Sequence, residues 1–418
     1  MALRERFEIP GKMRTWSLGL IAVGLVALVL GFIFIGMDHG DAGHGGEGHH
    51  TPGSHIFWGT LMYNSIFFLL ITNAAMFFIC ATTLAMGGWQ MVFRRVSEAI
   101  STLVPIFGII AFIVLMFVLF GTHIYHWNSH EAEADPILKG KLGFLNPTFF
   151  VIWTTLAIAL WSLLGWRMRK LSYEADQAPM DNEKGQGYIW RNTVNGSLFI
   201  VWFALTVGST VPWLWMMSLD AHWYSTMYSW YNFASSFVSG MALIALFVIY
   251  LKNKGYMELV TEEHLHDLGK FMFAFSIFWT YLWFAQYMLI WYSNQPEETV
   301  YFFHRVKGPY KGIFFLNLII NFICPLLILM RRGSKRNYTL MTFMAVLIIF
   351  GHWMDYYQMV IGSISPDHVT WGSYWWFDFG ILALFVGILI FFVGKALASK
   401  PLYAKHHPFL KESIIHHT

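Results

Sequence analysis

The sequence predicts an all-α integral membrane protein with about ten transmembrane helices. Hydrophobic residues make up 56% of the chain and charged residues only 12%, whereas a soluble domain is about 25% charged. Ten apolar runs also approach the roughly 20 residues with which a helix crosses a bilayer. A membrane helix satisfies its own backbone hydrogen bonds, whereas a membrane barrel requires shorter strands of alternating polarity. We therefore expect helices near residues 16–36, 60–84, 99–121, 147–167, 194–217, 228–250, 268–292, 311–330, 338–361 and 374–398.

The distribution of Lys and Arg predicts how these helices are oriented, because cytoplasmic loops carry an excess of both residues. With a cytoplasmic N-terminus, 22 of the 27 Lys and Arg residues lie on the cytoplasmic side. This bias predicts that both termini are cytoplasmic, which requires an even number of helices and agrees with ten. The five outer residues are Lys139, Lys141, Arg305, Lys307 and Lys311.

We expect a single polytopic membrane domain over residues 1–418, because no polar stretch is long enough to hold a soluble domain. A Gly- and His-rich outer loop is expected at 38–55 and a cytoplasmic tail at 399–418. Five histidines in the loop are potential metal ligands. Nothing there fixes the geometry of such ligands, so a flexible polar loop is the favoured interpretation.

A weak internal repeat predicts how the helices are grouped. The second helix begins near Tyr63-Asn64, and the sixth begins near Tyr231-Asn232, which is followed by Ser235, Ser236 and Ser239. Both helices would start from the outer side. This pattern favours two four-helix bundles, formed by helices 2–5 and 6–9, with the first and tenth helices at the periphery.

Cysteine and histidine usage argues against redox cofactors within this chain. The chain has two cysteines, Cys80 and Cys324, both in apolar runs. Their separation in the sequence excludes a CxxCH haem site, and their number excludes an iron–sulfur cluster with four cysteine ligands. A b-type haem would need paired histidines at matched depths, but only His352 is expected near the middle of the membrane. We therefore expect no haem, cluster or metal in this chain.

The strongest candidate site lies in the ninth predicted helix, which carries His352 and Asp355 within an apolar run. Ionisable residues inside a membrane helix are costly and are usually functional. The two residues are three positions apart and therefore share one helix face. An Asp–His pair in a partly dry environment is suited to transfer protons near neutral pH. The alternative is a structural hydrogen-bonded pair that holds helices together.

Other polar residues are expected at a similar depth, towards the outer side. They suggest a proton-handling or quinone-proximal cluster contributed by five helices. Because most of them lie near helix ends, solvation or helix capping is the competing interpretation for each. These candidates are His123, His126, Asp220, His222, Gln286 and Asp378, in addition to His352 and Asp355.

Three stretches carry a resemblance to a known family. Residues 215–226 read WMMSLDAHWYST, residues 281–298 read YLWFAQYMLIWYSNQPEE, and residues 351–355 read GHWMD. With the number and orientation of the helices, they make the chain resemble the F subunit of bacterial alternative complex III, a membrane subunit similar to the NrfD/polysulfide-reductase type. The resemblance covers essentially the whole chain. One departure is that residues 212–217 read PWLWMM, without the acid that some relatives carry before the MSL triplet.

The resemblance implies a multi-pass subunit of the bacterial inner membrane, in a respiratory complex that oxidises quinol and reduces cytochrome c or a terminal oxidase. It implies a homologous C subunit, an iron–sulfur subunit and cytochrome c subunits as partners, which would carry the haems and clusters. This chain would then scaffold the redox subunits and contact quinone or menaquinone, or conduct protons.

Two other functions remain open on the sequence. One is a proton-coupled secondary transporter that acts alone, and the other is the quinol-oxidising anchor of a molybdenum reductase. Transporters often contain paired, broken helices with charge at the middle of the membrane. No clear pairing of broken helices is visible in this sequence.

Overall fold

The computed structural model describes residues 6–37, 53–129, 132, 134–177, 179–366 and 372–417. Within these residues the chain is helical without strands, and ten helices are long and apolar enough to cross a membrane. The protein is therefore an all-α, multi-pass membrane protein, as the sequence predicts. Six of the ten spans are single helices: α2 (Gly53–Leu84), α6 (Pro147–Glu174), α9 (Met227–Asn253), α10 (Glu262–Ser293), α15 (Tyr338–Ile364) and α16 (Trp375–Ser399).

The other four spans consist of consecutive helical segments. They are α1 (Gly11–Gly31) with η1 (Phe32–Gly36); α3 (Arg94–Ser101) with α4 (Val104–Gly121); α7 (Asn182–Leu205) with η5 (Thr206–Thr210), α8 (Val211–Trp215) and η6 (Met217–Asp220); and α12 (Lys311–Leu318) with η7 (Ile319–Ile323) and α13 (Cys324–Leu329). The shorter elements are η2 (Trp89–Val92), η3 (His126–Asn128), α5 (Pro136–Lys141), α11 (Pro296–Val306), α14 (Arg332–Arg336) and α17 (Leu410–Ile414).

Several helices continue beyond the predicted apolar run by more than one helical turn, at the starts of α1, α2, α3, α7 and α10 and at the end of α6. Helix α2 begins at Gly53 rather than at residue 60, so residues 53–55 of the predicted loop belong to its first turn. Helix α7 begins at Asn182 rather than at residue 194, where the Asp181 side chain accepts a hydrogen bond from the Lys184 backbone N–H. Residues 38–52 of the predicted Gly- and His-rich loop lie outside the described residues.

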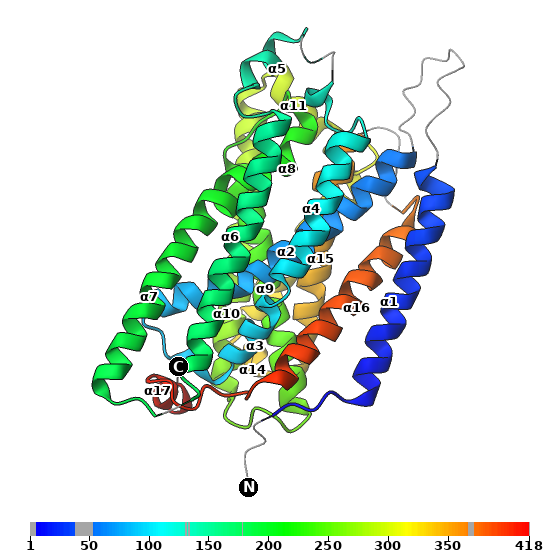
Figure 1. Cartoon of the computed structure of the whole chain (residues 1–418). Helices are drawn as coiled ribbons and strands as arrows, with labels where there is room; N and C mark the ends of the chain where they lie inside the picture. Colours follow the sequence, from blue (N-terminus) through cyan, green and yellow to red (C-terminus); the bar gives the residue numbers. More distant parts are fainter. Residues whose placement is uncertain are drawn as a thin grey trace.

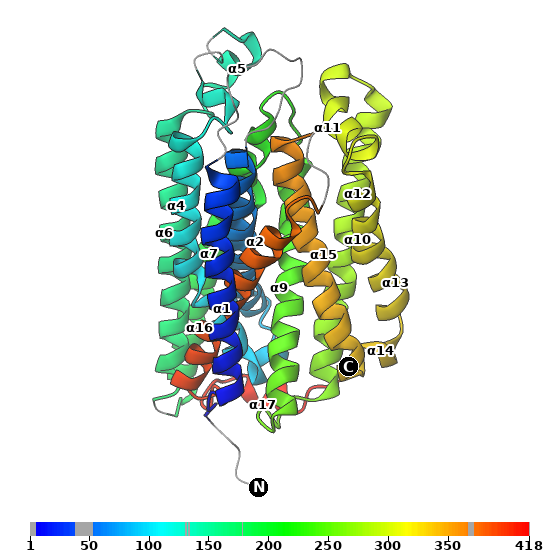
Figure 2. The same ribbon diagram turned by 90° about the vertical axis from the view of Figure 1, so that its right-hand side faces the viewer.

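The spans pack in the two groups that the repeat predicts. Helices α2, α4, α6 and α7 pack on one another, and α9, α10, α12–α13 and α15 form the second group; α2 joins the groups through contacts with α9 and α15. Helices α1 and α16 lie side by side at the periphery (Figures 1 and 2). They approach closely at Gly24 and Gly380, where an added Cβ would overlap Leu384 and Ala27, as is common between membrane helices.

The two ends of the molecule differ. The start of α1 and the short helix α17 lie at one end, whereas α5 and α11 lie at the other (Figures 1 and 2). We call these the α17 end and the α5 end. The assignment of the α17 end to the cytoplasm stays a prediction from the distribution of Lys and Arg.

Three spans contain π-helical turns, η1, η5 and η7, and the last two are each followed closely by a proline. Pro212 follows η5, and Pro325 follows η7. A proline within a helix has no N–H to donate and collides with the carbonyl group four residues earlier. A π-turn accommodates this collision, and such turns are frequent at functional sites.

A buried ion-pair network connects helices of the first bundle at the α17 end. The Glu98 carboxylate accepts hydrogen bonds from Arg94 Nε at 2.9 Å and from Arg95 Nη1 at 2.6 Å. Arg95 also reaches Asp176, just beyond α6, at 2.5 Å. Because Glu98, Arg94 and Arg95 are almost inaccessible to solvent, this network ties the start of α3 to the end of α6.

The predicted C-terminal tail is part of the fold. The Ser413 hydroxyl donates to the carbonyl oxygen of Trp89 at 2.6 Å and accepts from the N–H of Val92 at 3.2 Å. His416 Nε2 lies 2.6 Å from Asp267 Oδ2 of α10. The tail therefore crosses the α17 end and contacts both bundles.

We expect Glu98→Gln to lower the free energy of unfolding by about 3–5 kcal/mol, because two buried guanidinium groups lose their shared carboxylate. The matched control is Glu174→Gln, whose partner Arg191 is 56% exposed; it should cost less than about 1 kcal/mol. Thermal unfolding of each purified variant in detergent measures the effect. Equal losses in the two variants would contradict a structural role for the network.

Stability should also depend on pH through His407, which is buried against the Tyr188 ring, with the two ring centroids 5.4 Å apart. Burial lowers the pKa of His407 well below its usual value, and the positive charges of Arg94 and Arg95 lower it further. The folded chain therefore holds this imidazole in its neutral form.

Because the unfolded chain protonates His407 below pH about 6.5 and the folded chain does not, stability should fall as the pH drops below that value. The expected loss is up to about 1.4 kcal/mol per pH unit. Unfolding temperatures measured from pH 7.5 down to about 5.5 should decline less steeply in His407→Gln. The exposed control His417→Gln should follow the unmodified protein, and an unchanged slope in His407→Gln would contradict the prediction.

Candidate functional site

The carboxylate of Asp355 lies past the middle of α15 and is 2% exposed. The hydroxyl of Tyr231, near the start of α9, donates a hydrogen bond to Oδ1. The indole N–H of Trp279 in α10 donates to Oδ2 at 3.0 Å, and the Ser235 hydroxyl lies 3.4 Å from the same oxygen. Donors from two neighbouring helices thus surround this buried carboxylate.

His352 lies beside this carboxylate but does not bond to it directly. Its Nδ1 is 3.9 Å from Asp355 Oδ2 and 3.0 Å from the Ser235 hydroxyl, which therefore bridges the two side chains. The imidazole packs edge-on against Trp279, with ring centroids 5.3 Å apart. Its Nε2 is buried without a hydrogen-bond partner among the described residues.

A glycine next to the pair allows two helices to approach closely. An added Cβ at Gly351 would overlap the side chain of Asn321 in the π-helical turn η7. About two turns further along α15, the Gln358 amide oxygen accepts a hydrogen bond from Asn317 Nδ2 at 3.3 Å. These contacts hold the eighth span against the helix that carries His352 and Asp355.

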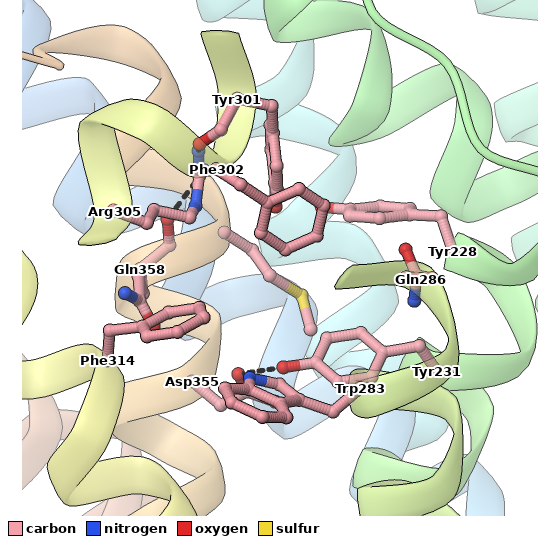
Figure 3. A pocket seen from close by; sticks show the side chains of 11 residues that line it. Tyr228, Tyr231, Trp283, Gln286, Tyr301, Phe302, Arg305, Phe314, Asp355 and Gln358 are labelled. Carbon is pink, nitrogen blue, oxygen red and sulfur yellow. Dashed lines mark hydrogen bonds between the residues drawn. The ribbon is translucent and has the colours of Figure 1, made fainter. Parts of the chain in front are cut away.

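A small cavity is lined by Asp355 on one side and by Arg305 on another (Figure 3). Its volume of about 30 Å³ exceeds the roughly 10–15 Å³ that one water molecule needs. Pockets for small organic ligands are typically about 300–1,000 Å³. The cavity therefore fits a few water molecules but not a quinone ring in this conformation. It is lined by Tyr228, Tyr231, Trp283, Gln286, Tyr301, Phe302, Arg305, Phe314, Asp355, Gln358 and Met359.

The short helix α11 covers this cavity and contributes a buried cation. The Arg305 guanidinium lies over the Tyr301 ring, 3.4 Å from its centroid, and Nη1 donates to the Tyr301 carbonyl oxygen at 2.8 Å. Nη2 donates to the Gln358 carbonyl oxygen at 3.1 Å and to the Ser363 hydroxyl at 3.0 Å. The Tyr301 ring also stacks on Trp223, with centroids 3.8 Å apart.

The structure divides the eight predicted site residues among several places. Gln286 and Asp355 line the cavity, and His352 lies beside Asp355. Asp378 is buried elsewhere, on α16, where it accepts hydrogen bonds from Tyr63 at 3.0 Å and Thr60 at 3.1 Å in α2. The expected single cluster from five helices is therefore not formed.

The remaining predicted residues lie at the α5 end. His123 and His126 lie beyond α4, and Asp220 is half-buried at the end of η6. His222 Nε2 lies 2.5 Å from the Asp135 carboxylate, and this hydrogen bond lowers the pKa of Asp135 below its usual value. These four residues therefore lie at or beyond the ends of spans.

The weak internal repeat has a structural counterpart. Tyr63 in the first bundle donates to Asp378, and Tyr231 in the second bundle donates to Asp355. Each bundle therefore begins with a helix whose tyrosine satisfies a buried carboxylate. The two carboxylates differ in that Asp355 faces a cavity.

Several residues around Asp355 could not be assigned from the sequence. Tyr231 and Ser235 stand out in the repeat, but nothing local connects them to Asp355. Trp279 and Tyr301 resemble the aromatic residues common at membrane interfaces. Arg305 is indistinguishable from the other charges of an outer loop, since only the packing of α11 reveals its burial.

Comparison of the sequence with models of known protein families and with curated proteins finds no match. Within the described part of the chain, no three or more His, Cys, Asp or Glu side chains are grouped to hold a metal ion. The function is therefore argued from the site itself and from the sequence motifs around it.

Proposed function

We propose that this chain is an integral membrane subunit of a respiratory quinol-oxidising complex of the alternative complex III type. In this proposal, Asp355 exchanges protons with water in the adjoining cavity. The subunit also scaffolds partner subunits that carry the haems and iron–sulfur clusters, in the bacterial inner membrane.

The three motifs that carry the family resemblance support the proposal, because they meet at one place. The first motif supplies Trp223, which stacks on Tyr301 at the edge of the cavity. The second supplies Trp283 and Gln286 to the cavity wall, and the third supplies Asp355. Segments that are far apart in the sequence thus surround one buried carboxylate.

The observation that carries the proton role is the position of Asp355 between hydrogen-bond donors and a polar cavity. Tyr231, Ser235 and Trp279 stabilise the carboxylate when it is ionised. When Asp355 is protonated, its O–H can donate to cavity water. The volume of about 30 Å³ favours this role over quinone contact.

Copurification tests the proposed assembly. We expect the tagged chain, solubilised in mild detergent, to be isolated with multihaem cytochrome and iron–sulfur subunits and with quinol-oxidising activity. Mass spectrometry and optical spectra of the preparation identify these partners. Isolation of the chain alone with proton-coupled substrate uptake would instead support a transporter, and isolation with a molybdenum subunit would support a reductase anchor.

Asp355→Asn tests the proton role in the assembled complex. The change removes the titratable group at nearly constant size, so the complex should assemble while turnover falls by about 10²-fold, the scale of general acid–base effects. Quinol oxidation and proton release are measured on the purified complex.

The matched control is Asp181→Asn, because Asp181 is an exposed helix cap and asparagine caps helices equally well. Its activity should be unchanged. Unaltered quinol oxidation and proton release in Asp355→Asn would make the Asp355 site structural.

A further inference from the structure

Arg305 is the feature of the cavity that the proposed function leaves unexplained. Its side chain is 3% exposed, and its hydrogen bonds all go to neutral groups: two carbonyl oxygens and one hydroxyl. Among the described residues, no carboxylate lies within ion-pair distance of it. An arginine remains protonated even when buried. The cavity therefore contains a permanent positive charge without a direct partner.

We propose that Arg305 is the counter-charge of Asp355, paired with it through water in the cavity, and that it controls when Asp355 releases its proton. Both side chains line the same cavity, Arg305 from α11 and Asp355 from α15 (Figure 3). A buried charge is strongly destabilising unless an opposite charge compensates it. Asp355 is the carboxylate that lines this cavity.

The lining of the cavity supports a water bridge. The amide nitrogen of Gln358 is buried without a hydrogen-bond partner within the described part of the chain, and this side chain lines the cavity together with the polar side chains of Gln286, Tyr228 and Tyr301. Buried polar groups are almost always hydrogen-bonded, to water if not to protein. Water bound by these groups would connect the guanidinium to the carboxylate.

The other described charged or titratable groups near Asp355 do not supply a positive charge to pair with its carboxylate. The nearby wall of α10 contributes the neutral Trp279 and Gln286, and α12 contributes Phe314. Asp220 of η6 interacts with Tyr301 but does not line the cavity. Arg305 is therefore the permanent cation among these groups. The remaining titratable groups are Tyr228 and Tyr231 of α9, Tyr301 of α11, and Tyr356 and His352 of α15 itself.

This proposal rests on the proposed proton role of Asp355, and it adds that Arg305 controls the release of that proton. When Asp355 transfers its proton to cavity water, the O–H bond of the carboxyl group breaks and a new O–H bond forms on water. The carboxylate that remains forms a neutral pair with Arg305. Without Arg305, the same step would leave an uncompensated buried anion, so the proton should be held more tightly.

Infrared difference spectroscopy of the purified complex tests this idea. The C=O stretching band of protonated Asp355 is identified by its loss in Asp355→Asn and is followed as a function of pH. In Arg305→Gln the band should persist to a pH about one unit higher or more, a tenfold change in proton concentration. Arg305→Lys keeps the charge and should stay closer to the unmodified protein. The control Arg191→Gln, at an exposed ion pair, should not change the titration.

An unchanged titration of the band in Arg305→Gln would overturn the proposal. If this variant does not accumulate as a folded complex, the double variant Arg305→Gln/Asp355→Asn decides the question, because it removes both charges of the proposed pair. Recovery of folded complex in the double variant supports the pairing, and failure to recover overturns it. The proton role of Asp355 is tested separately. Unchanged turnover in Asp355→Asn, together with a band titration that still depends on Arg305, would contradict the proton role and leave the pairing intact.

Discussion

Burial of the Asp355 carboxylate constrains how three helices of the second bundle pack, because its hydrogen-bond donors come from α9 and α10. A carboxylate removed from water is unstable unless hydrogen bonds or an opposite charge compensate for the lost hydration. Tyr231 and Ser235 of α9 and Trp279 of α10 supply donors from two directions. Each donor must face the same point on α15, so the three helices are held in one relative orientation.

The same constraint explains how the region towards the α5 end is built. Helix α11, in the connection between α10 and α12, places Arg305 and Tyr301 over the cavity beside Asp355. Trp223 packs on the ring of Tyr301. The cover is thus assembled from segments that are distant in the sequence, and it places a cation and polar groups around a volume that suits a few water molecules.

The fold was largely predictable from the sequence, but the site was predictable only in part. Hydropathy and length locate the ten spans because the bilayer imposes both requirements on each helix separately. The cost of charge in an apolar helix singles out His352 and Asp355 for the same local reason. Gln286 was also expected near them, and it lines the same cavity as Asp355.

What could not be predicted depends on contacts between helices. Asp378 is, like Asp355, an acidic residue in a membrane helix that was expected near the site, yet it is satisfied by Tyr63 and Thr60 away from the cavity. Glu98 could equally have been a solvated helix end, but Arg94 and Arg95 enclose it. No periodicity or composition encodes these partners, because they come together only when the helices pack.

The central claim is that a hydrated cavity connects Asp355 to its counter-charge. A high-resolution map of the intact assembly, in which ordered water is resolved, tests this most directly. The account predicts water in the cavity, bonded to Asp355 and Gln286 and continuing to Arg305. A dry cavity filled by side chains or lipid, with no water at the Asp355 carboxylate, would contradict it.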